Sequence, residues 1–140
     1  MTIHNKERLI LDLSKQKIRI LIANDDNEVN ILIAATLVLK GYEVYKTHSA
    51  NECISKLEEF EGKVNVLLLD GGIAADRGAM VIVRVKRINP DIMILAVADD
   101  ESEKTRVLDY GADGFTTKPI SVETIVDKVS TLLTVGKNVG

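Results

Sequence analysis

The chain has little of several features that would narrow its function at once. Its single cysteine, Cys53, cannot form a disulfide within the chain and suits a reducing cytoplasm. Its two histidines, His4 and His48, lie far apart with no other soft ligand nearby, so there is no zinc signature. No apolar run is long enough to cross a bilayer, and the N-terminus has no signal-peptide core. We therefore expect a cytoplasmic protein that does not enter a membrane.

Charge of one sign is also scarce. The formal net charge of −3 gives no general attraction to nucleic acid or to an anionic membrane. The glycine-rich phosphate loops of nucleotide-binding proteins are absent from the sequence. With 46% hydrophobic residues among 140, the chain is most simply one globular domain.

Apolar runs and helical patterns alternate along the chain. Short apolar or alternating runs predict strands at 18–23, 42–47, 64–70, 92–98 and 115–117. Helical spacing and end signals predict helices at 28–40, between Ser49 and Gly62, at 78–88, from Asp99 or Asp100 to Tyr110, and from Ser121 to Leu133. Five β–α units in this length predict an α/β fold of the flavodoxin-like (βα)5 kind. Its five-stranded parallel sheet has the order 2-1-3-4-5, with helices on both faces. The domain is expected to span 18–135, between an N-terminal extension at 1–17 and a tail at 136–140.

Charged side chains stand where the predicted strands end. Strand 64–70 ends on Asp70, the first strand leads into Asn24 and Asp25, and the last one leads into Lys118. In the proposed topology these ends meet at one edge, where two close carboxylates favour a hard cation such as Mg²⁺. A carboxylate beside Mg²⁺ and an ammonium is equipped to attack a phosphoryl group. The alternative is that the acids only cap helices.

Three stretches together resemble the receiver domains of two-component response regulators: Ile20–Asp26, Leu67–Asp70 and Gly111–Pro119. The resemblance covers roughly residues 18–133. It implies a signalling module rather than an enzyme, with Asp70 as a phosphoacceptor served by a histidine kinase or phosphotransfer protein.

The resemblance also implies roles for the residues around the acceptor. Mg²⁺ would be bound by Asp25, Asp70 and the backbone carbonyl of Gly72, and Lys118 would pair with the phosphoryl group. A cis peptide bond would usually join Lys118 to Pro119, and Phe115 matches the aromatic position that reports the active state. The surface formed by residues 100–133 commonly meets partners or a second receiver.

The sequence departs from the family pattern at two positions near the acceptor. Asn24 replaces a usual acid, so Mg²⁺ binding is expected to be weaker, with Asn24 acting through a metal-bound water. Ala96 replaces a usual threonine or serine, so the hydroxyl that couples phosphorylation to conformation is missing, and the larger Val97 follows it. The acceptor loop also has Ala74 where proline is common.

These departures keep other functions open. We expect Asp70 to be phosphorylated with a weakened or rewired switch. The first alternative is a pseudo-receiver, a binding module that works without phosphorylation. The second is an enzyme or nucleotide-binding protein on the same fold, since fold does not fix function. A phosphatase with Asp70 as nucleophile would be expected to have a second acid at position 72, where this chain has glycine.

Overall fold

The structure is a computed structural model that describes residues 17–70 and 80–139. The predicted extension, apart from Lys17, and the predicted positions Gly72 and Ala74 lie outside the described residues. Within the part of the chain that the structure describes, no helix is both long and apolar enough to cross a membrane.

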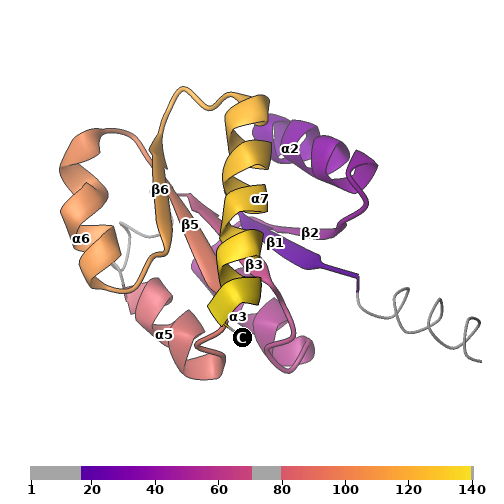
Figure 1. The fold of residues 1–140 in the computed structure, drawn as a ribbon. Helices are drawn as coiled ribbons and strands as arrows, with labels where there is room; N and C mark the ends of the chain where they lie inside the picture. The colour runs from indigo at the N-terminus through magenta and orange to yellow at the C-terminus, as the bar shows by residue number, and fades with distance from the viewer. Residues whose placement is uncertain (1–16, 71–79, 140) are drawn as a thin grey trace, which may run out of the picture.

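Five parallel strands form one sheet (Figure 1). They are β1 (Arg19–Ala23), β2 (Glu43–Thr47), β3 (Val66–Asp70), β5 (Met93–Ala98) and β6 (Gly114–Thr117). Their order is β2-β1-β3-β5-β6, so the predicted order 2-1-3-4-5 is confirmed. All five residues of β3 are buried, because helices cover both faces of this central strand.

Of the helices in the described residues, two cover one face of the sheet and three cover the other (Figure 1). Helices α2 (Asn27–Leu39) and α7 (Val122–Val139) pack on one face through Ile33, Leu37, Ile125, Val129 and Leu132. Helices α3 (Ala50–Glu59), α5 (Met80–Ile88) and α6 (Lys104–Asp109) pack on the other through Cys53, Ile54, Leu57, Val81, Ile82, Val85 and Val107. The fold is the doubly wound arrangement that the alternating pattern predicts.

The helix ends follow the local sequence signals. Asp26 caps α2, because its Oδ1 accepts hydrogen bonds from the backbone N–H groups of Glu28 and Val29. Ser49 caps α3 by accepting from the N–H of Glu52, and the Glu52 carboxylate accepts from the N–H of His48. These two hydrogen bonds form a Ser-x-x-Glu capping box whose second bond is shifted by one residue, from the N–H of Ser49 to that of His48.

Two predicted helices end or begin differently. Helix α7 continues to Val139, six residues beyond the predicted end at Leu133. The backbone stays helical through Gly136, because no proline follows Leu133 to end the helix. A glycine inside a helix costs only about 1 kcal/mol. The helix after β5 begins as a 3₁₀ turn (Glu101–Glu103), because Asp100 Oδ1 accepts from the N–H of Ser102 and tightens the first turn.

Cys53 offers a probe of global opening. Its side chain is fully buried in α3, and burial raises the pKa of its thiol to about 12. Since thiolate is the reactive form, modification at mildly alkaline pH requires the domain to open. We expect labelling by a thiol reagent to be at least about a thousandfold slower in native buffer than in denaturant. Rapid labelling of folded protein, monitored by intact mass, would contradict the packing described for α3.

Candidate functional site

Asp70 and Lys118 form an ion pair at the carboxyl edge of the sheet. Asp70 ends the central strand and is only 4% exposed. Lys118 follows β6, and its Nζ lies 2.8 Å from Asp70 Oδ1. The hydrogen bond to Asp70 raises the pKa of Lys118, so the ammonium is fully charged at neutral pH. A buried carboxylate and an ammonium on a long side chain are thus in direct contact, at the edge where the sequence predicts that the two strands end.

A second carboxylate shares Lys118. Asp99 lies just beyond β5, and its Oδ1 is 3.4 Å from Lys118 Nζ. The Asp99 side chain is largely exposed, so it contributes less than the buried partner. The sequence did not predict this contact. The only available signal was that Asp99 follows a strand adjacent to the one before Lys118.

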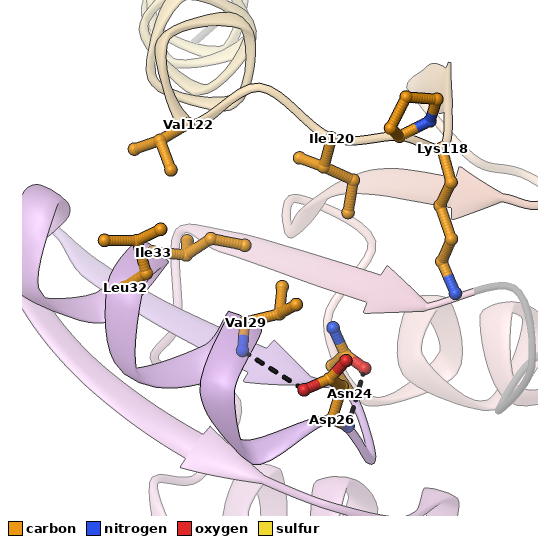
Figure 2. A pocket seen from close by; sticks show the side chains of 9 residues that line it. Asn24, Asp26, Val29, Leu32, Ile33, Lys118, Ile120 and Val122 are labelled. Carbon is orange, nitrogen blue, oxygen red and sulfur yellow. Dashed lines mark hydrogen bonds between the residues drawn. The ribbon is translucent and has the colours of Figure 1, made fainter.

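The Lys118 backbone is also fixed. Its N–H donates to the carbonyl of Ala98 at 2.9 Å, which extends the β5–β6 pairing by one residue. The peptide bond from Lys118 to Pro119 is cis. Figure 2 shows the Lys118 side chain running from this turn toward the edge where Asn24 lies.

The three polar residues after β1 have separate places. The Asn24 side chain is buried, its Oδ1 accepts from the N–H of Asp26 at 3.0 Å, and its carbonyl accepts from Asn30 Nδ2 at 2.6 Å. Asp26 is committed to the helix cap. Asp25 is exposed at the same edge of the sheet and is the acid of this group that can turn toward a cation.

Asn24 and Asp70 line a small void together. The void has a volume of about 10 Å³, and Val97 forms another part of its wall. This space is enough for about one water molecule. Val97 therefore restricts the room beside the acceptor, where a smaller residue would leave more.

The oxygen donors at this edge of the sheet fit the ligand preferences of Mg²⁺. Among the described residues, no group of three or more histidine, cysteine, aspartate or glutamate side chains is arranged to hold a metal ion. Asn24, Asp25 and Asp70 nevertheless place hard oxygen donors at one edge. The Asn24 amide oxygen has a second lone pair beyond the one used by Asp26. Mg²⁺ commonly keeps several waters and takes only one or two protein carboxylates, so this set suits it.

The two predicted switch positions are neighbours in the sheet. Ala96 in β5 pairs in register with Phe115 in β6 on one side and with Leu69 in β3 on the other. Ala96 is buried, and Phe115 is half-buried against the core under α3, α5 and α6. Ala96 carries no hydroxyl, so no side-chain hydrogen bond can link this strand position to a group on Asp70.

A larger pocket opens beside the site, between α2 and the start of α7 (Figure 2). Its volume is about 300 Å³. Its wall is formed by Asn24, Asp26, Val29, Leu32, Ile33, Lys118, Pro119, Ile120 and Val122. Figure 2 shows the polar groups of Asn24, Asp26 and Lys118 toward one end of the pocket and the apolar side chains of Leu32, Ile33 and Val122 toward the other.

The fold and the site together define a class of protein. It is a doubly wound (βα)5 domain with a buried aspartate and a lysine at the carboxyl edge of its sheet. The family model of the response regulator receiver domain matches residues 20–130. The chain belongs to this family.

Known relatives agree with this assignment. The chain is 31% identical over 112 residues to the nisin biosynthesis regulatory protein NisR of Lactococcus lactis subsp. lactis. This match covers 79% of the chain and 48% of that protein, so the chain spans about half the length of this curated relative.

Solved structures show the same fold. A CheY-like receiver domain protein from Methanospirillum hungatei JF-1 superposes with a TM-score of 0.80 at 23% identity, covering 89% of this chain and all of that one. A response regulator from Chloroflexus aurantiacus J-10-fl superposes with a TM-score of 0.75 at 24% identity, covering 85% of this chain and 99% of that one.

Proposed function

We propose that the chain is a phosphoacceptor receiver and that Asp70 takes a phosphoryl group from a histidine kinase or phosphotransfer protein. The observation that carries this proposal is the buried Asp70 carboxylate with Lys118 Nζ at 2.8 Å. A solely structural acid at a strand end has no need of burial beside a half-exposed ammonium. The chain acts as a signalling module in the cytoplasm, which suits its single buried thiol.

In the transfer step, an oxygen of Asp70 attacks phosphorus. A P–O bond forms to Asp70 while the bond from phosphorus to the donor imidazole breaks, and the imidazole leaves with its electron pair and takes a proton from solvent. Lys118 then faces a more negative group and remains paired with it, which stabilises the product. Mg²⁺, when bound by Asp25, Asp70, the Gly72 carbonyl and an Asn24-held water, supplies charge neutralisation.

The readout of this event is altered. Without a hydroxyl at Ala96, strand β5 has no side-chain hydrogen bond with which to sense the phosphoryl group. In the family pattern, the hydroxyl at position 96 moves inward and makes room for the aromatic ring at position 115. Phe115 has no such hydroxyl beside it, because position 96 is alanine. We propose that phosphorylation is retained while this route of coupling is weakened.

The test is phosphorylation by acetyl phosphate and Mg²⁺, read by intact-mass spectrometry. The wild-type chain is expected to gain the mass of one phosphoryl group, and Asp70→Asn is expected to gain none. Asp99→Asn is the matched control, because it removes the other carboxylate at Lys118 and is expected to keep the adduct. No adduct on the wild type, alike with Asp70→Asn, would contradict the proposal.

A pseudo-receiver is the second candidate, favoured by Asn24 and Ala96 in place of the usual acid and hydroxyl. It predicts partner binding that Asp70→Asn leaves unchanged, together with a wild type that forms no adduct. The resemblance further suggests a receiver homodimer through residues 100–133. Among the described residues of that segment, the exposed large apolar side chains are Leu108 and Tyr110.

A further inference from the structure

Helix α2 is apolar on its outer side as well as its inner side. Ile33 and Leu37 are buried against the sheet, as expected for a covering helix. On the outer side, Leu39 is 87% exposed, Ile31 and Leu32 are each 58% exposed, and Val38 is 54% exposed. A helix that is apolar all round is normally covered on every side, and contiguous exposed apolar surface marks an interaction site.

The exposed residues form one stripe along α2. Leu32, Ala35 and Leu39 follow the three-and-four spacing of a helix-pairing seam, flanked by Ile31 and Val38. Glu28 continues this seam at the N-terminal end, and Lys40 follows α2 at the other. The stripe between these two opposite charges contains no charged residue.

A hollow and a protrusion lie at opposite ends of the stripe. The hollow is the pocket of about 300 Å³, whose apolar lining includes Val29 and Leu32 of α2 together with Ile120 and Val122 (Figure 2). The protrusion is Leu39, seven residues further along α2 from Leu32. At a rise of about 1.5 Å per residue, this separation is about 10 Å.

We propose that the outer face of α2 pairs with the same face of a second copy of this chain, with the two helices antiparallel. Such a pairing has a two-fold axis, so each contact occurs twice. An axis beside Ala34 and Ala35 brings Leu39 of each copy over the pocket of the other. It also brings Glu28 of each copy to the same level along the pair as the partner's Lys40, whose long side chain can reach across from the flank of the seam. The small side chain of Ala35 lets the helices approach closely at the crossing.

Charge and shape both select this occupant. A parallel pairing would set Glu28 against Glu28, whereas the antiparallel one joins opposite charges at both ends. The pocket and the apolar protrusion belong to the same helix, so one symmetric contact fills both pockets. The face predicted from the resemblance exposes only Leu108 and Tyr110 among its described large apolar residues, and is therefore the weaker candidate.

Sedimentation velocity across a concentration series tests the pairing. The wild-type chain is expected to form dimers in a concentration-dependent way. Leu39→Glu is expected to weaken dimerisation by more than about tenfold, because the symmetric contact loses a buried leucine twice. Leu108→Glu is the matched control and is expected to dimerise as the wild type does. A monomeric wild type, or dimers that Leu108→Glu disrupts and Leu39→Glu does not, would overturn the proposal.

A reciprocal charge exchange separates pairing from helix stability. Glu28→Lys and Lys40→Glu each place a like-charge contact in the interface and are expected to weaken the dimer. The double variant restores both opposite-charge pairs and is expected to regain affinity. Each substitution also opposes the helix dipole, so urea unfolding of the monomer should show two losses that add and no rescue. Dimer affinity that falls further in the double variant would refute the antiparallel register.

Cross-linking fixes the occupant. With Cys53 buried, Ala35→Cys supplies an accessible thiol next to the proposed axis, and mild oxidation is expected to give a disulfide-linked dimer. Leu108→Cys is expected to remain largely unlinked. If Ala35→Cys stays unlinked, the stripe is covered by something else, such as residues 1–16 or a different protein, and the proposal fails. Asp70→Asn cannot accept a phosphoryl group and is still expected to pair, so a failure of the pairing can be told apart from a failure of the phosphorylation proposal.

Discussion

Replacing Lys118 by methionine is expected to lower the free energy of unfolding by about 2–3 kcal/mol in metal-free buffer. The change leaves the Asp70 carboxylate, which is 4% exposed, without the ammonium now 2.8 Å from it. Lys118 itself is partly exposed, so solvent screens the contribution of its charge to the free energy of unfolding. We therefore expect a smaller loss than for a fully buried ion pair. Urea unfolding monitored by circular dichroism measures the difference.

The opposite half of the pair should behave differently. Asp70→Asn removes the buried charge and leaves Lys118 beside Asp99 and solvent, so its cost is expected to be within about 1 kcal/mol. Lys104→Met is a control for loss of a surface cation and is expected to change stability by less than about 0.5 kcal/mol. Equal losses for Lys118→Met and Asp70→Asn would show that burial of Asp70 does not dominate the pair.

The pH dependence of this contribution has a definite sign. Because the pKa of Lys118 is raised in the folded chain, the stabilisation is present at neutral pH. It is lost only as the pH rises through that raised value, above the usual 10.5. The gap between wild type and Lys118→Met should therefore stay constant from pH 7 to pH 9.

Changing Asn24 to aspartate is expected to tighten Mg²⁺ binding by at least about tenfold, because affinity at hard-oxygen sites rises with the number of charged ligands. Asn24 is buried at the edge that holds Asp70, and aspartate can still accept the hydrogen bond from the Asp26 N–H. The added charge should also lower stability in the absence of metal. Isothermal titration with Mg²⁺ measures the affinity.

A matched variant tests whether position matters rather than net charge. Asn27→Asp adds the same charge at an exposed residue in the first turn of α2, three residues from Asn24. Its effect on Mg²⁺ affinity is expected to be less than about threefold, since exposed charges are screened. Equal tightening by Asn24→Asp and Asn27→Asp would argue against a metal site at Asn24.

The sequence was most informative where one physical cause dominated. The run ending at Asp70 reads as a strand covered on both faces because every residue of β3 is buried. The sheet order follows from alternation and right-handed crossovers, which leave few topologies. From these two causes alone, the sequence predicts that Asp70, Asn24 and Lys118 lie at one edge of the sheet.

What the sequence could not supply depends on tertiary placement. Nothing around Asp99 indicates a contact with Lys118, because the contact is made across two strand ends. The apolar spacing of α2 predicts a helix, but it does not tell which apolar residues face solvent. The end of α7 was predicted at Leu133, but the sequence holds no breaking signal there and the helix continues to Val139.

The pocket beside α2 gives the chain a form of thermodynamic linkage. Asn24 and Lys118 contribute to its wall, and the same two side chains border the acceptor carboxylate. A copy seated there and a phosphoryl group on Asp70 would thus act on shared residues. If pairing changes the equilibrium constant for phosphorylation by some factor, phosphorylation changes the equilibrium constant for pairing by the same factor, because such coupling is reciprocal. A receiver lacking the hydroxyl at Ala96 would then still have a route from acceptor to surface, through Lys118.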